Sequence, residues 1–192
     1  MVYIKSKITT VSTFTPVILI FTDANWGGDS DSKSISSYVI SVCTADEILD
    51  VINNSIYPPG NAITWSSRRQ RSFVADSTEA AETFCMVEAS KVNAWLRIKL
   101  DDSAARQEKP SLLLNDNKAS LLNAKDGRIT NNNKHRCRQV AFLGQEVANG
   151  NITPAYVASA SNRANNGTKP VNRVDFEKER YAYMRVAVSS DS

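Results

Sequence analysis

Short apolar runs separated by polar turns dominate the first seventy residues. Residues 17–21 are aliphatic and β-branched and lead into Thr22 and Asp23, which is typical of a buried strand that ends at a polar edge. Apolar residues alternate with small or polar ones over residues 36–43, and residues 62–65 resume the extended pattern. We therefore expect three strands here, with neighbouring strands antiparallel.

From residue 77 the hydrophobic spacing becomes helical. Apolar side chains recur every three or four residues between Ser77, a suitable N-cap, and residue 100, so we predict one long helix. Further strands are predicted at 111–114 and 152–157, and further helices at 119–124, 140–147 and 174–184. Antiparallel strands followed by alternating helices and strands indicate an α/β protein, with one mixed sheet and helices on its faces.

The chain is expected to form one domain over residues 17–184. Its 192 residues, 42% of them hydrophobic and 22% charged, are typical of a single globular domain. We interpret residues 1–16 as an N-terminal extension and residues 185–192 as a C-terminal tail. Residues 44–60 form an insertion much longer than the roughly 2–5 residues of an ordinary hairpin loop. This insertion is a candidate surface for a partner.

Composition and charge narrow the functional classes. Lys and Arg total 23 and Asp and Glu total 20, so the net charge of +3 does not by itself indicate nucleic-acid binding. The single histidine, His135, excludes mechanisms that need two, among them most zinc hydrolase sites. No apolar run approaches the ~20 residues that span a bilayer. We therefore expect a cytoplasmic or nuclear protein that does not contact a membrane.

Three acidic residues lie where predicted strands end or a helix begins: Asp23, Glu79 and Asp116. Ligands gather at such junctions in α/β sheets. Carboxylates brought together there repel one another unless cations neutralise them, and hard oxygen ligands suit Mg²⁺ or Mn²⁺. Two such ions would serve displacement at a phosphodiester. On spacing alone an ordinary structural alternative stays open. In it, Asp23 caps a turn, the helix dipole favours Glu79 in the first turn of the long helix, and Asp116 is a loop residue.

A series of short motifs runs in a fixed order along the chain. It comprises residues 21–29 (FTDANWGGD), 34–39 (SISSYV), 62–70 (AITWSSRRQ), 77–80 (STEA), 95–97 (WLR), 115–118 (NDNK), 134–135 (KH), 150–152 (GNI) and 168–170 (TKP). The series resembles the ribonuclease H domain of copia-type LTR retrotransposons over about residues 17–184. The resemblance implies the ribonuclease H-like fold, with a five-stranded mixed sheet flanked by helices. It also implies cleavage of the RNA strand of RNA·DNA hybrids with two Mg²⁺ (or Mn²⁺) ions, beside a reverse transcriptase domain.

The resemblance assigns catalytic and metal-binding roles to three carboxylates. Asp23 matches the first catalytic aspartate of the family and Asp116 the third. Counted from the tryptophan of the third strand, the catalytic glutamate falls on Glu79. Counted back from the tryptophan of the long helix, it falls on Ala80, so this stretch holds one extra residue. We assign the role to Glu79.

The fourth catalytic position departs from the family pattern. The family has an aspartate after an alanine, shortly before Thr-Lys-Pro, and this chain has Asn165 there. An asparagine keeps a carbonyl oxygen but loses a charge worth about 4 kcal/mol at ~4 Å and an effective dielectric of ~20. A second hypothesis follows from Asn165, the extra residue and the insertion. In it, the chain is a domesticated, catalytically inactive ribonuclease H-like module that binds nucleic acid or a host protein partner.

Polar and basic residues near the motifs are candidates for contact with nucleic acid. The set is Ser66, Arg68, Arg69, Asn117, Lys118, Lys134 and Arg136. The basic members would neutralise phosphates, and the polar ones suit contacts to 2′-hydroxyl groups. For each basic residue, a solvated surface charge is the open alternative. The three tryptophans are expected in the core or on a sheet face.

Overall fold

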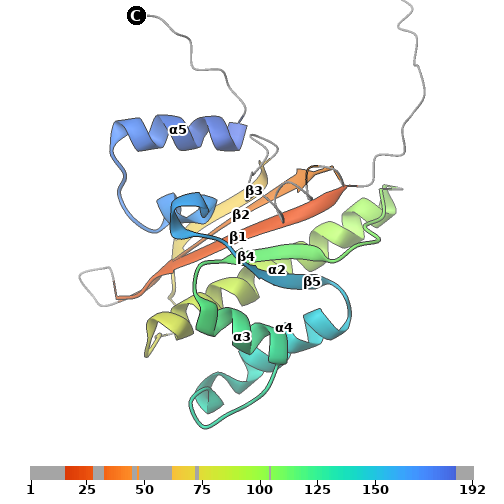
Figure 1. Ribbon diagram of the computed structural model, residues 1–192, viewed down its shortest axis with the longest axis vertical. Coiled ribbons are helices and arrows are strands. Elements are labelled where there is room, and N and C mark those ends of the chain that lie inside the picture. Colours follow the sequence, from red (N-terminus) through yellow and green to blue (C-terminus); the bar gives the residue numbers. More distant parts are fainter. Residues whose placement is uncertain are drawn as a thin grey trace, which may run out of the picture.

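The computed structural model describes residues 16–27, 33–44, 47, 62–71, 74–103 and 105–184. The predicted insertion at 44–60 and the two predicted tails lie outside these residues, apart from a few positions at their edges. A five-stranded sheet in the order β3-β2-β1-β4-β5 forms the centre (Figure 1). Its strands are β1 (Val17–Asn25), β2 (Ile35–Cys43), β3 (Ala62–Arg69), β4 (Ser111–Asn115) and β5 (Ile152–Tyr156).

Helices follow the strands in the predicted order. The α-helices are α2 (Thr78–Asp102), α3 (Lys118–Asp126), α4 (Cys137–Ala148) and α5 (Arg173–Met184). Short 3₁₀ helices lie at η1 (Lys134–Arg136), η2 (Ser159–Ser161) and η3 (Arg163–Gly167). The Ser77 side chain caps α2 by accepting a hydrogen bond from the backbone N–H of Ala80 at 3.2 Å. The helices and strands that the hydrophobic spacing predicts are therefore confirmed, with shifted ends.

The sheet is mixed, as predicted. Strand β1 pairs antiparallel with β2, and β2 pairs antiparallel with β3. Strand β4 runs parallel to β1, and β5 runs parallel to β4. The carboxyl ends of β1 and β4 therefore meet at one edge of the sheet, where ligands bind in folds of this type.

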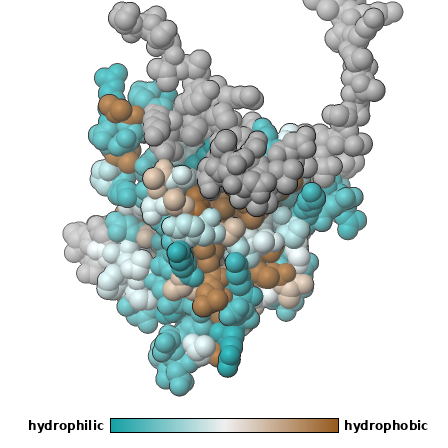
Figure 2. Space-filling model, viewed as in Figure 1, coloured by the Kyte–Doolittle hydropathy of each residue, from teal (hydrophilic) through white to brown (hydrophobic). Residues whose placement is uncertain are grey.

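Both faces of the sheet are buried at β1, which explains why this strand is an uninterrupted apolar run. Ile18 and Ile20 face the side covered by α2, α3 and α4, where they pack with Met86. Leu19 and Phe21 face the opposite side, where η3 and α5 lie (Figure 1). Figure 2 shows apolar side chains gathered between the more hydrophilic surfaces of these layers.

The segment that contains η3 lies very close to the sheet. A Cβ atom on Gly167 would stand 2.0 Å from Ser37 Oγ on β2, and the Ser67 hydroxyl donates a hydrogen bond to the Gly167 carbonyl oxygen. Glycine is required here because any side chain would collide with the strand. This approach brings Asn165 and Thr168 to the same edge of the sheet as Asp23.

The tryptophans lie outside the core, but Trp65 lies on strand β3 of the sheet, which is one of the two predicted placements. Trp26, Trp65 and Trp95 are 50%, 69% and 59% exposed, so none lies in the core. Trp26 is nevertheless held, because its indole N–H donates to the Ala75 carbonyl oxygen at 3.0 Å. None of the helices in the described part of the chain combines the length and apolar character that a bilayer crossing requires.

Candidate active site

Three carboxylates meet where β1 and β4 end. Asp23 belongs to β1, Asp116 directly follows β4, and Glu82 comes from the second turn of α2. One carboxylate oxygen from each lies within 4.8 Å of the other two. Asp23 and Glu82 are buried, whereas Asp116 is partly exposed. The junctions of strand and helix therefore do assemble an acidic cluster, as the sequence predicts for Asp23 and Asp116.

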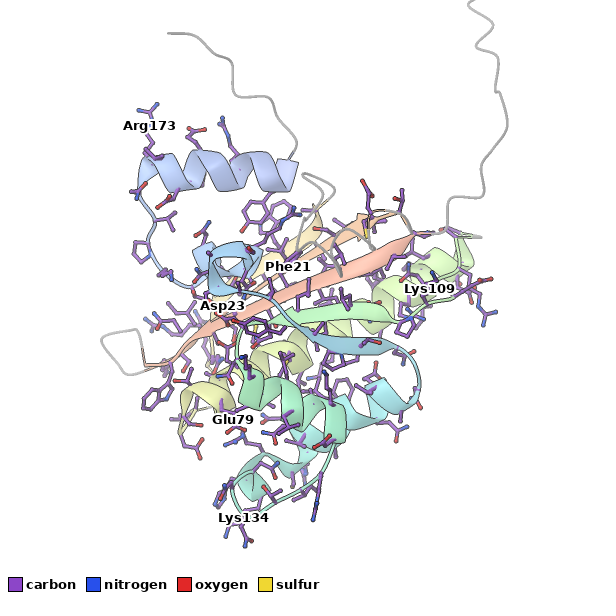
Figure 3. All side chains as sticks on the ribbon, in the orientation of Figure 1. Phe21, Asp23, Glu79, Lys109, Lys134 and Arg173 are labelled. Atoms are coloured by element: carbon purple, nitrogen blue, oxygen red, sulfur yellow. The ribbon has the colours of Figure 1, made fainter. Side chains whose placement is uncertain are left out.

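The glutamate of this cluster is not the one that the sequence predicts. Glu79 lies one turn earlier on α2, and its carboxylate accepts hydrogen bonds from Arg136, at 2.8 Å, and from Asn123. Its charge is thus already balanced outside the cluster, and Figure 3 shows it on the side of α2 below Asp23. Glu82 is the residue that α2 contributes to the cluster.

Each of the three carboxylates is held by a neutral donor from another segment. The Thr168 hydroxyl donates to Asp23 Oδ2 at 2.5 Å, and the Asn115 amide donates to Glu82 Oε2 at 2.8 Å. The Ser159 hydroxyl donates to Asp116 Oδ2. Neutral donors fix the orientation of a carboxylate without cancelling its charge. The cluster therefore keeps its negative potential while its oxygens stay in place.

Burial and mutual repulsion disfavour the charged forms of two of these groups. Burial raises the pKa of Glu82 from its ordinary 4.5 to about 8, and the hydrogen bond from Asn115 opposes this shift. Burial also raises the pKa of Asp23, with the negative charge of Asp116 adding to it. The hydrogen bond from Thr168 and the charge of Lys169 act in the opposite direction on Asp23. A cation would relieve the repulsion and favour the ionised forms.

The donor set fits a hard divalent cation. It consists of three carboxylates, and no histidine or cysteine joins this cluster within the described ranges. Oxygen-only sets of this kind suit Mg²⁺ and Mn²⁺, not zinc or copper. The cluster opens into a cleft of about 370 Å³, which Thr78, Asn117 and Lys169 also line. The cleft gives a substrate access to the carboxylates.

Asn165 lies at the same cleft. It follows Ala164 in η3 and lines the cleft together with the three carboxylates. Its amide Nδ2 donates a long hydrogen bond, 3.4 Å, to the Ser159 carbonyl oxygen. Asn165, for which the motif series predicts an aspartate, therefore lines the cleft with an uncharged side chain.

The residues predicted to contact nucleic acid lie in three places: at the carboxylate cleft, in a separate groove, and away from both. Asn117 lines the cleft and caps α3, accepting a hydrogen bond from Ser120 N at 3.1 Å. Lys118 is exposed beside it, with its ammonium group 5.1 Å from the centre of the Tyr156 ring. Ser66, Arg68 and Arg69 line a separate groove of about 640 Å³ between β3 and α2.

Two further predicted contacts do not face the cleft. Arg136 is buried, with its side chain 4% exposed, and it forms ion pairs with Asp76 at 3.2 Å and Glu79 at 2.8 Å. It therefore stabilises the junction of η1 with the start of α2, and these ion pairs account for its charge without a phosphate. Lys134 is exposed and lies at the far end of the molecule from Asp23 (Figure 3).

Comparison with solved structures identifies the fold. No protein-family model matches the chain. The solved structure of LC11-RNase H1, isolated from compost by a metagenomic approach, is similar with a TM-score of 0.51 and 15% sequence identity. The similarity covers 79% of this chain and 91% of that one. The chain therefore has the ribonuclease H fold, as the motif series predicts.

The chain is also similar in sequence to two curated proteins. The retrovirus-related Pol polyproteins from transposons RE1 and RE2 of Arabidopsis thaliana are each 25% identical to this chain over 158 residues. These residues are 82% of this chain but 10% of each polyprotein. The chain thus has the ribonuclease H fold and is similar to retrotransposon Pol polyproteins, and it spans a tenth of the length of the curated relatives it matches.

Proposed function

We propose that this chain is a copia-type retrotransposon ribonuclease H domain that hydrolyses the RNA strand of RNA·DNA hybrids. The observation that carries the proposal is the convergence of Asp23, Glu82 and Asp116 at the carboxyl ends of two parallel strands in a ribonuclease H fold. These three residues would hold two Mg²⁺ (or Mn²⁺) ions. Such ions would supply an activated water molecule and stabilise the leaving oxygen of the phosphodiester.

The residues of the chain contribute charge, orientation and access. Asp23 and Glu82 are buried and present fixed oxygens, because Thr168 and Asn115 hold them. Asp116 is partly exposed and lines the cleft, so an entering substrate would reach it directly. Asn117 lies beside it, and its side chain is suited to hydrogen bonds with a ribose hydroxyl group. Lys118 and Lys169 would offset the charge of the phosphate that enters the cleft.

We assign the groove between β3 and α2 to the backbone of the hybrid away from the cleaved bond. Arg68, Arg69 and Arg71 line this groove, and all three are exposed. Each phosphate that they neutralise would release counterions and add salt-dependent affinity. The groove and the carboxylate cleft would then hold different parts of one extended substrate.

The homology to Pol polyproteins supports a role beside a reverse transcriptase domain, in the cytoplasm or the nucleus. A hybrid is the product of copying RNA into DNA, so an enzyme that removes the RNA strand acts directly after that copying. We propose the reverse transcriptase domain as the natural partner of this chain.

Asn165 favours a second candidate function. The site lacks the fourth negative charge of the family, which weakens its hold on a divalent ion. A domesticated, inactive module that binds nucleic acid or a host protein is the alternative. It predicts hybrid binding without cleavage.

Cleavage of a labelled RNA·DNA hybrid in Mg²⁺ and in Mn²⁺ tests the proposal. We expect cleavage of the RNA strand, abolished by Glu82→Gln. Binding of the hybrid without cleavage in either metal would overturn the enzyme and support the binding module. If the unaltered chain does not cleave the hybrid, an Asn165→Asp variant assayed alongside shows whether the missing charge alone accounts for the absent cleavage.

A further inference from the structure

A single buried asparagine joins the segments that carry the three carboxylates. Asn115 is the last residue of β4, directly before Asp116, and its side chain is fully buried. Its amide Nδ2 lies 2.8 Å from Glu82 Oε2, 3.0 Å from Thr22 Oγ1 and 3.1 Å from the Thr22 carbonyl oxygen. Its Oδ1 accepts the backbone N–H of Asn117 at 2.7 Å.

The neighbours of Asn115 fix which way its amide points. A backbone N–H can only donate, so the atom of Asn115 that faces Asn117 N must be the oxygen. The amide nitrogen therefore faces Glu82. The Thr22 hydroxyl donates its own hydrogen to the Leu114 carbonyl oxygen at 3.1 Å, which leaves its lone pair free to accept from Asn115. The NH₂ group has two hydrogens for three acceptors, so one faces Glu82 Oε2 and the two Thr22 oxygens share the other.

This arrangement restrains the member of the carboxylate cluster that has the longest side chain. Glu82 has a longer side chain than either aspartate and is the one that reaches the cluster from a helix. The hydrogen bond from Asn115 fixes Oε2, and the backbone N–H of Ala24 also donates to the Glu82 carboxylate. Because both donors are neutral, the restraint does not cancel the charge that attracts a cation.

We propose that Asn115 is the positioning residue that holds Glu82 in a cation-binding orientation and sets its place relative to Asp23 and Asp116. The inference rests on the proposed function of this cluster as a divalent-metal site. It adds a residue that the motif comparison does not assign. Asn115 acts through Glu82, and it also contacts Thr22 and Asn117, the neighbours of the two aspartates.

Mn²⁺ binding measured by electron paramagnetic resonance tests the inference without relying on activity. We expect Asn115→Leu, which keeps the size of the side chain but removes the donor, to weaken Mn²⁺ binding by about 10- to 100-fold. Asn93→Leu is the matched control, because Asn93 is equally buried but its Oδ1 accepts from Ser111 Oγ, away from the cluster. We expect this control to bind Mn²⁺ like the unaltered chain.

A double-mutant cycle separates positioning from general loss of structure. In a Glu82→Gln background, Asn115→Leu should cost little further Mn²⁺ affinity, since its effect passes through Glu82. Full additivity of the two changes would overturn the inference, and so would equal affinities of Asn115→Leu and the unaltered chain. If the unaltered chain binds Mn²⁺ but does not cleave the hybrid, the proposed function fails and the positioning role stands. If it binds no Mn²⁺, both fail.

A second measurement covers the case in which Asn115→Leu does not fold. In the unaltered chain, the side-chain NH₂ group of Asn115 should give a nuclear magnetic resonance signal that exchanges slowly with water. Glu82→Ala removes its acceptor and should shift this signal and speed its exchange. An Asn115 signal that is indifferent to Glu82→Ala would overturn the contact on which the inference depends.

Discussion

The Arg136 guanidinium donates a hydrogen bond to Glu79 Oε1 at 2.8 Å, from a side chain that is almost wholly buried. This ion pair joins the start of α4 to the first turn of α2. It also occupies the carboxylate that the sequence motif assigns to the metal. Glu79 and Glu82 of α2 therefore have separate tasks: Glu79 stabilises the fold, and Glu82 belongs to the candidate site.

The first prediction follows from this division. Glu82→Gln should lower hybrid cleavage by at least about 100-fold while leaving thermal unfolding nearly unchanged, because it removes one charge from the cluster. Glu79→Gln should keep most of the cleavage and lower stability, since it weakens the pair with Arg136. Cleavage rates and unfolding curves of both variants check this. Loss of cleavage in Glu79→Gln alone would restore the motif-based assignment.

Substitution of Arg136 should affect stability and not nucleic-acid contact. Arg136→Met keeps the apolar stem and removes the charge from Asp76 and Glu79. We expect a loss of about 2 kcal/mol in the free energy of unfolding, because partners of a buried charge are left unpaired. Urea unfolding measures this loss. A stable variant with weakened hybrid binding would contradict the structural role.

Substitution of Arg69, in contrast to that of Arg136, should affect nucleic-acid binding and not stability. It is exposed and lines the groove between β3 and α2. If this groove follows the hybrid backbone, Arg69→Ala should weaken hybrid binding and reduce the slope of log affinity against log salt concentration by about 1. Filter binding over a range of salt concentrations measures both. An unchanged slope would remove Arg69 from the interface.

Restoring the family's charge at residue 165 should strengthen the site. Asn165→Asp adds a carboxylate at the cleft, and a charge at ~4 Å is worth up to about 4 kcal/mol at an effective dielectric of ~20. We expect Mn²⁺ affinity to rise by about 10-fold or more, with faster cleavage. Asn166→Asp is the matched control, one residue further along η3. Equal gains in both variants would indicate a general charge effect.

Cation binding should depend on pH through Glu82. Its pKa in the metal-free fold is about 8, above the ordinary 4.5, so below pH 8 the group is protonated and a cation must displace the proton. Mn²⁺ affinity should therefore rise as the pH increases toward 8 and level off above it. The metal-free domain should lose stability as the pH rises from about 4.5 to about 8, because the carboxyl ionises in the unfolded chain while burial keeps it protonated in the fold. Calorimetry at several pH values measures both effects, and Glu82→Gln should flatten the first.

The sequence predicts most of the fold because the hydrophobic spacing is clear. The apolar run of β1 and the three-to-four-residue repeat of α2 each depend on local pattern alone. Asp23 and Asp116 are also predictable, because in each case a buried apolar run ends in polar residues that include the aspartate. Glu82 carries a signal as well: it is in phase with the buried positions Met86 and Ala89 of α2. Counting from the tryptophans on either side points to residue 79 or 80, and neither count considers this buried phase of the helix.

Side-chain direction is what the sequence does not provide. Arg136 and Lys118 are both basic and both follow motif residues, yet one is buried in ion pairs and the other is exposed beside Tyr156. Asn115 has a polar side chain at the end of a buried strand, and its role depends on contacts with residues 33 and 93 positions away in the chain. Such contacts exist only once the sheet and α2 have packed together.

The three cluster carboxylates stand at positions 23, 82 and 116, on segments that are far apart in the unfolded chain. A cation that binds all three can therefore bind only the folded domain, and its binding energy adds to folding stability by mass action. At a free cation concentration 100 times the Kd, this amounts to about 2.7 kcal/mol. A cell short of free magnesium would then hold less of this domain, through unfolding and proteolysis of the metal-free chain, before any slowing of catalysis became apparent.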